Sequence, residues 1–377
     1  MKAIINGKII TMEKEDLDSG IILINDEGKI EKVGTKIEIP EGSEVIDAQG
    51  KYILPGFIDA HTHLGIYEEI YAHEGDDVNE MSEPVTPQLR AIDGINIHDI
   101  GFQDALKGGV TTAMIAPGSA NVVGGTVCIM KTAGKSFKSR LIKESAGMKV
   151  AFGENPKEVY GSEKKMPYTR MGIAALLRET LVEGQNYIKD KESEKDLGKD
   201  EIARVLNHKM PLRAHAHRAD DILTAIRIAN EFNLKLTIEH GTEAHLIMEE
   251  LKESEVPVCM GPLLISRAKV ELKEKSFKNP GILQKNGIKV ALITDHPETP
   301  IDYAVLNAIL AVKEGMDPKE ALKALTINPA EIMGIDKSTG SLAPGKDADI
   351  VIWSGDPLNI MNKAELVMIE GNVVWNI

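Results

Sequence analysis

The sequence is poor in aromatic residues and cysteine, and it lacks any long apolar run. Aromatic residues make up 4% of the 377 residues, so a core must come from the remaining hydrophobic residues, chiefly Ile, Leu, Val, Ala and Met. No run approaches the ~18 apolar residues of a membrane helix, and the N-terminal segment lacks the apolar region of a signal peptide. Cys128 and Cys259 lie in apolar settings and are predicted to be buried free thiols. These features predict a soluble cytoplasmic protein.

Positive charge is also in deficit. The chain carries 44 basic and 58 acidic residues, a formal net charge of −14. A nucleic-acid partner would need a basic face, and an anionic membrane surface would repel this chain. We therefore expect no nucleic-acid or membrane partner. The expected partner is a small-molecule substrate, and a homo-oligomer is expected only on the base rate for enzymes of this size.

The two ends of the chain differ from its middle. Short β-branched segments separated by Asn-Gly, Glu-Gly and Gln-Gly turns occupy residues 1–54, and "DADIVIWSG" and "KAELVMIEGNVVWNI" continue the pattern within residues 339–377. Strands from both termini are therefore predicted to form one small β-sandwich domain.

Residues 55–338 alternate apolar strand candidates with amphipathic helical stretches, a pattern and length that suit a (β/α)8 TIM barrel. We count eight strand candidates, of which the third is the least secure: Phe57–His61, Thr111–Ala116, Val127–Lys131, Lys149–Gly153, Leu212–His215, Lys235–Glu239, Val256–Met260 and Lys289–Thr294. The predicted fold class is thus α/β, a barrel with a terminal β-sandwich.

Residues that can bind metal ions end five of these eight strands. They are His61 and His63, Glu154, His215 with His217, His240, and Asp295, which His296 follows. Each alone is weak evidence, because a strand-end histidine is more often a hydrogen-bonded core group, and Asp295 or Glu154 suits a helix N-terminus. In a barrel, however, parallel strands deliver their C-terminal residues to one rim. The joint pattern predicts a metal site.

The motifs "DAHTH", "TIEHGTE", "ITDHP" and "GSLAPGKDADIVIW" resemble the metal-dependent amidohydrolase superfamily, close to its imidazolonepropionase-like and dipeptidase-like branches. The resemblance covers essentially the whole chain and implies a barrel with a β-sandwich from both termini. It also implies that His61, His63, His215, His240 and Asp295 are metal ligands.

Many binuclear members of the superfamily bridge the two metals with a carboxylated lysine at the end of strand four. Here Glu154 is expected to bridge instead, because Lys149 is predicted to lie on the face of its strand opposite Glu154 and Lys157 lies beyond a proline; a lysine bridge is the alternative. His217 is expected to contact substrate, or to replace His215 as the ligand.

Further substrate contacts are assigned to residues after the strand ends. Lys157 and Tyr160 are candidates to bind a carboxylate or a developing oxyanion, with a surface cluster and a packing tyrosine as the alternative. Arg218 is a further carboxylate candidate, and His296, which follows Asp295, is also predicted to bind substrate.

The resemblance implies a metal-dependent hydrolase that cleaves a C–N amide bond other than an ordinary protein peptide bond. The substrate would be a cyclic amide, a dipeptide or an N-acyl amino acid. Two divalent ions, zinc or alternatively Mn, Fe or Ni, would share a hydroxide as the nucleophile, with Asp295 as the catalytic acid–base. The alternatives are a mononuclear deaminase, against which the absence of a glutamate on strand five counts, and a non-enzymatic relative, which would be expected to lose ligands.

Overall fold

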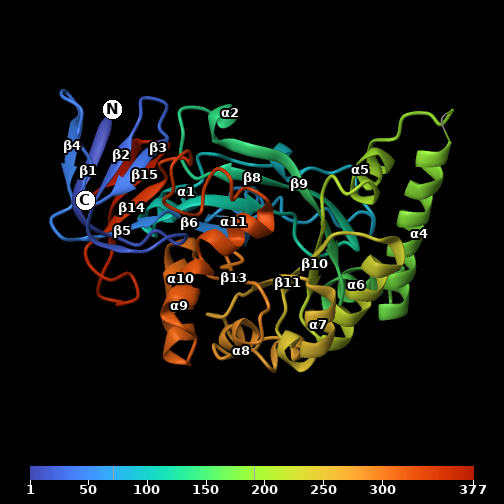
Figure 1. Ribbon diagram of the computed structural model, residues 1–377. Coiled ribbons are helices and arrows are strands. Elements are labelled where there is room, and N and C mark those ends of the chain that lie inside the picture. Colours follow the sequence, from blue (N-terminus) through green and yellow to red (C-terminus); the bar gives the residue numbers. More distant parts are fainter. Residues whose placement is uncertain (71, 191) are drawn as a thin grey trace.

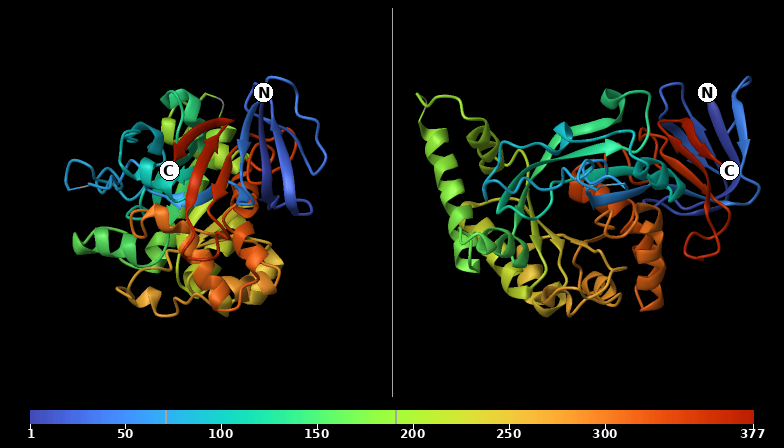
Figure 2. Two further views of the ribbon diagram at one scale, coloured as in Figure 1. Left: turned by 90° about the vertical axis from the view of Figure 1, so that its left-hand side faces the viewer. Right: turned by 180° about the vertical axis from the view of Figure 1, so that it is seen from behind.

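The computed structural model describes residues 1–70, 72–190 and 192–377. Two β-sheets organise the molecule (Figure 1, Figure 2). A terminal sheet contains both chain ends, and a barrel sheet occupies the centre. The long helix α4 (Arg170–Lys189) stands at the end of the molecule opposite the two termini.

The terminal sheet interleaves the two ends of the chain. Strand β5 pairs in parallel with β1, where Lys8 faces Tyr52, and antiparallel with β14, where Ile53 faces Ile352. Inward isoleucines such as Ile4, Ile22 and Ile53 build its core. The sheet consists of β1 (Lys2–Ile9), β2 (Leu17–Ile24), β3 (Ile30–Gly34), β4 (Glu44–Asp47), β5 (Tyr52–Pro55), β14 (Ile350–Trp353), β15 (Ala364–Ile369) and β16 (Asn372–Asn376).

The strands of the two termini do pair with one another, as predicted. All eight belong to one hydrogen-bonded sheet, so a separate sandwich domain, with the boundaries given above, stays a prediction.

The barrel sheet is nearly closed, and its strands are apolar and buried along most of their length, as expected for strands covered on both faces. Its strands are β6 (Phe57–Thr62), β7 (Val110–Ile115), β8 (Val123–Lys131), β9 (Leu141–Ala151), β10 (Leu212–Ala216), β11 (Leu236–His240), β12 (Val258–Met260) and β13 (Val290–Leu292). Eight strands were predicted at these places, and eight are present.

The direction of the third strand differs from the (β/α)8 prediction. Strand β8 is antiparallel to both β7 and β9, while the other seven strands run in one direction. The connections on its two sides are short, and the second contains only α2 (Phe137–Arg140). No crossover helix therefore lies between β7 and β9. The predicted all-parallel barrel is wrong in this one strand, which runs antiparallel to its neighbours.

The edge strands β6 and β13 meet through the residues that follow them. The backbone N–H of Asp295 donates to the carbonyl of His61 at 3.1 Å, and that of His63 donates to His296 at 2.9 Å. The buried Asp59 carboxylate accepts from the hydroxyl of Thr294 at 2.6 Å and from the His61 N–H at 3.2 Å. The barrel is thus held closed at the rim that carries the predicted ligands.

Helices cover the outside of the barrel. Side chains cap several of them: Thr169 accepts from the Gly172 N–H at the start of α4, and Asp317 accepts from two N–H groups at the start of α10. Besides α2 and α4, the helices are α1 (Gly101–Lys107), α3 (Glu154–Ser162), α5 (Leu197–Leu206), α6 (Ala219–Phe232), α7 (Met248–Ser254), α8 (Asn279–Lys285), α9 (Ala304–Lys313), α10 (Pro318–Lys323) and α11 (Ile327–Met333). Single 3₁₀ turns lie at Ala91–Asp93, Ala244–Leu246, Val270–Leu272 and Ile301–Tyr303.

Among the helices of the described residues, none combines the length and the apolar character that crossing a bilayer requires.

Buried charges join the two sheets. Lys131, at the end of β8, forms ion pairs with Asp347 at 3.0 Å and with Asp349, both just before β14. Asp349 also accepts from the Thr339 hydroxyl at 2.8 Å and from the Glu370 N–H at 3.0 Å. Phe57 packs against Trp353 beside this cluster, with ring centroids 5.2 Å apart.

Candidate metal centre

Three of the predicted ligands converge where β6 and β13 meet. The Nε2 atoms of His61 and His63 each lie 3.3 Å from Oδ1 of Asp295. That oxygen is buried and has no hydrogen-bond partner among the described residues. Asp295 adopts φ +56°, a left-handed conformation that disfavours residues other than glycine. Local strain of this kind is characteristic of functional sites.

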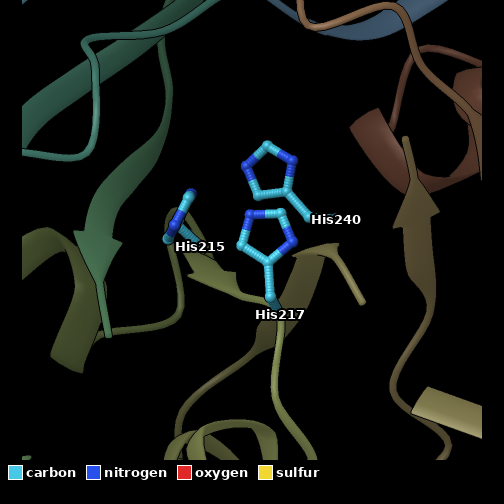
Figure 3. Close-up of side chains that lie close together, drawn as sticks. All are labelled: His215, His217 and His240. Carbon is cyan, nitrogen blue, oxygen red and sulfur yellow. The ribbon is translucent and has the colours of Figure 1, made fainter. Parts of the chain in front are cut away.

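A second group comes from β10 and β11. Figure 3 shows the imidazoles of His215, His217 and His240 turned toward one another. Ring centroids lie 4.4 Å apart between His215 and His240, and 4.6 Å between His217 and His240, which stack. His240 also has a left-handed backbone, with φ +72°. In each of the two groups, one ligand atom per residue lies within 4.8 Å of the others.

His215 fits a metal ligand best. The side chain is buried, yet neither ring nitrogen has a hydrogen-bond partner within the described part of the chain. A buried imidazole without partners is costly, and a metal ion would satisfy it. Burial, followed by the neighbouring His240, lowers the pKa of His215 well below its usual value. The ring is therefore neutral, which is the form that coordinates metals.

In His61, His63 and His240, a hydrogen bond at Nδ1 fixes the orientation of the ring. In His61 this atom is 2.8 Å from Oε2 of Glu239, and in His63 and His240 it is 2.7 Å and 2.8 Å from the carbonyls of Ala116 and Gly261. A proton on Nδ1 leaves the lone pair on Nε2 for a metal, and such backing contacts orient most ligating histidines.

Glu239 is itself paired with a cation. Nε of Arg213 lies 2.7 Å from Oε1 of Glu239, and the arginine also donates to the Ala60 carbonyl at 2.8 Å. Neither Arg213 nor Glu239 was among the residues predicted from the sequence, although the position of Glu239 directly before His240 was a usable signal.

Lys149 of β9 contacts the first ligand group and lines the same cavity as the second. Its Nζ is 3.1 Å from Nε2 of His61, the side chain is fully buried, and it lines a cavity together with His63, His215, His217, His240 and Asp295. Burial lowers the pKa of this lysine to about 8, against the opposing effect of Asp295 and Glu239. The prediction that Lys149 lies away from the site is wrong.

Glu154 does not join the ligands. It begins α3, and its backbone N–H donates to Oε2 of Glu271 at 3.2 Å. It belongs to neither group and does not line the cavity. The prediction assumed that the alternation of side chains between the two faces of β9 continues to Glu154. The strand ends at Ala151 and Gly153 has a φ of +85°, so the alternation does not reach Glu154.

Four of the predicted substrate contacts also lie outside the cavity lining, whereas His217 lines it. Arg218 is engaged by Asp220 through two hydrogen bonds of 2.9 and 3.0 Å. Lys157 is half-buried on α3.

The other two are buried and occupied elsewhere. The Tyr160 hydroxyl bonds to the Asn121 side chain at 2.5 Å and to the Glu83 carbonyl at 2.8 Å. Nδ1 of His296 accepts from the Ile301 N–H at 3.2 Å.

A model of the amidohydrolase family matches residues 52–374. The chain belongs to the amidohydrolase family. Members of this family are hydrolases of C–N bonds in small molecules and usually bind divalent metals. A solved amidohydrolase structure from Thermotoga maritima MSB8 is 44% identical to this chain, covers 100% of both chains and superposes with a TM-score of 0.97.

The curated relatives of this amidohydrolase carry different activities in their names. This chain is 29% identical to amidohydrolase tasK of Hapsidospora irregularis over 95% of its length, and 28% identical to an adenine deaminase of Petrotoga mobilis over 92% of its length. It spans only 40% and 53% of the lengths of those two proteins. An imidazolonepropionase of Shewanella oneidensis is 25% identical, with 92% of this chain and 88% of the relative covered.

Proposed function

We propose that this chain is a metal-dependent hydrolase that uses two divalent ions to cleave an amide C–N bond. The observation that carries the proposal is the pair of three-residue ligand groups, of which all members but His61 line one cavity, with the buried Lys149 beside them. His61, His63 and Asp295 would hold one ion, and His215 and His240 the other. Zinc suits this set of imidazoles and a carboxylate, as do Mn, Fe and Ni.

Lys149 would take the ligand role that was predicted for Glu154 from the sequence. Its neutral amine would add to CO2, forming an N–C bond and releasing one proton, and the carbamate would offer two oxygens as ligands. Support comes from its position: Nζ lies 3.1 Å from a ligand atom of the first group, and the side chain lines the same cavity as the second.

The bound ions would supply Lewis acidity and lower the pKa of water to about 7. Asp295 would accept a proton from the attacking water and return it to the leaving nitrogen, general acid–base work worth ~10²–10⁴-fold. Its position 3.3 Å from both His61 and His63 keeps its carboxylate at the reacting centre. Burial lowers the pKa of His217 to about 3, so this ring would meet the substrate in its neutral form.

A mononuclear deaminase is the second candidate, favoured by the adenine deaminase among the relatives. It requires one tightly held ion. The second ligand group, with the unpartnered His215, argues for two.

Metal analysis combined with a substrate screen tests the proposal. Purified protein should contain about two divalent ions per chain, and the screen would offer dipeptides, N-acyl amino acids and cyclic amides. Asp295→Asn should keep most of the metal but lose ~10²–10⁴-fold in kcat. One ion per chain with release of ammonia from a purine would favour the deaminase, and equal activity in Asp295→Asn would remove Asp295 from the mechanism.

A further inference from the structure

Three polar side chains of the cavity wall are linked by hydrogen bonds, and none of them belongs to a ligand group. Nζ of Lys269 donates to Oδ1 of Asn155 at 2.5 Å, and Nδ2 of Asn155 donates to the hydroxyl of Ser119 at 2.5 Å. Ser119 and Lys269 lie in the loops after β7 and β12, Asn155 lies in the first turn of α3, and all three line the cavity beside the ligand groups.

Lys269 is a cation without an anion. Within the described residues, no carboxylate oxygen lies within 4.0 Å of its Nζ. Neighbouring lysines in the same loop are satisfied: Lys273 pairs with Glu243 at 3.6 Å, and Lys275 donates to the carbonyls of Leu263 and Ile265. An ammonium group has three N–H donors, and the amide oxygen of Asn155 takes only one of them.

The charge of Lys269 acts on the metal side of the cavity. Lys269 lines the same cavity as His215, His217 and Asp295. An ammonium group that faces a cavity and has no carboxylate in contact with it can bind an anion from outside the protein.

We propose that Lys269, with Asn155 and Ser119, binds a free carboxylate on the substrate. This inference rests on the proposed amide hydrolysis and narrows its substrate class to amides with a carboxylate close to the scissile bond, such as N-acyl amino acids and dipeptides. The cavity volume of about 260 Å³ suits a molecule of that size, and Pro262, Ile265 and Leu272 give it an apolar wall for a side chain.

Matched acids and amides test the carboxylate subsite in the metal-loaded protein. The probes are N-acetyl-L-leucine and N-acetyl-L-leucinamide, with Gly-Leu and its amide as a second pair. Wild type should prefer each acid at least tenfold in kcat/KM, with most of the difference in KM. Lys269→Met should lose that preference while keeping kcat for the amides, and Lys269→Arg should keep part of it.

Lys278→Met is the control, because Lys278 is an exposed lysine outside the cavity, 4.0 Å from Glu314; this variant should behave as wild type. A binding readout accompanies the kinetics: N-acetyl-L-leucine should raise the thermal midpoint of wild type more than that of Lys269→Met, and the amide should shift both equally.

The outcomes separate the two proposals. Amide hydrolysis with no preference for acids, unaffected by Lys269→Met, overturns the carboxylate subsite and leaves the hydrolase standing. A Lys269-dependent midpoint shift without hydrolysis of any probe supports the subsite and counts against the hydrolase. Equal midpoint shifts in wild type and Lys269→Met, with equal kcat/KM for each acid, contradict the subsite outright.

Discussion

Two buried lysines on neighbouring strands of the barrel sheet have opposite environments. Lys131 ends β8 and is held by the carboxylates of Asp347 and Asp349. Lys149 lies on β9, has no carboxylate within 4.0 Å among the described residues, and faces an imidazole nitrogen. The pKa of Lys131 is raised, because its two carboxylates outweigh burial, whereas burial dominates for Lys149 and lowers its pKa.

The contrast distinguishes a lysine with a structural role from one with a functional role. A buried lysine that is paired with carboxylates fixes how two segments pack against each other. A buried lysine without such a pair is available to bind a ligand or to react. Lys131 joins the terminal sheet to the barrel, and Lys149 belongs to the candidate metal centre. The following changes test whether the two lysines really divide in this way.

The largest effect is expected from Lys149→Met. Loss of the bridging ligand should reduce amide hydrolysis by ~10³-fold or more, about 4 kcal/mol of transition-state stabilisation, and lower the metal content below two ions per chain. Denaturant unfolding of the metal-free variant should show no loss of stability, because no carboxylate loses its partner. A variant that keeps full activity and both ions would exclude Lys149 as the bridge.

Lys131→Met should have the reverse profile. Asp349 loses its cation and Asp347 keeps only Lys29, which should cost about 3–5 kcal/mol of unfolding free energy, measured in urea at pH 7. Kinetic constants of the folded fraction should stay at wild-type values. A loss below ~1 kcal/mol would mean that Asp347 and Asp349 do not depend on this lysine.

Glu239→Gln should have a smaller effect on the centre. Glutamine can still accept from Nδ1–H of His61, but it leaves Arg213 without its carboxylate. Loss of such a backing contact typically lowers metal affinity 10–100-fold, measurable by competition with a chelator. An unchanged dissociation constant would show that Glu239 does not orient the ligand.

The smallest effect concerns pH. Burial alone would raise the pKa of Asp347, but Lys131 and Lys29 outweigh it and hold that pKa below its usual value. A lowered carboxyl pKa contributes stability that is complete above the unfolded value of about 3.9 and is lost as the pH falls through the lowered folded value. The stability gap between wild type and Lys131→Met should therefore narrow from pH 7 to pH 3. A gap that widens would reverse the assigned sign.

The sequence predicted the parts of the molecule that depend on periodicity. Apolar runs located all eight barrel strands, and because most strand ends share one rim, His61, His63, His215, His240 and Asp295 were expected near one another; they lie in two neighbouring groups, and their role as ligands stays a prediction. Pairing of the terminal strands followed from their β-branched composition and turn residues.

What the sequence did not predict depends on direction and on loops. An apolar run looks the same in either direction, so nothing marked β8 as antiparallel. Counting alternate residues failed at Gly153, which put Glu154 in the place of Lys149. Lys269 lies in a loop whose path is set by tertiary contacts, and no local pattern distinguished it from the satisfied Lys273 and Lys275.

Anomalous X-ray diffraction from crystals grown with zinc and bicarbonate would show directly whether the barrel binds two ions. We expect two peaks in the barrel, one bound by His61, His63 and Asp295 and one by His215 and His240, with density for a carboxylated Lys149 between them. A single peak, or ions bound elsewhere while these side chains stay uncoordinated, would contradict it.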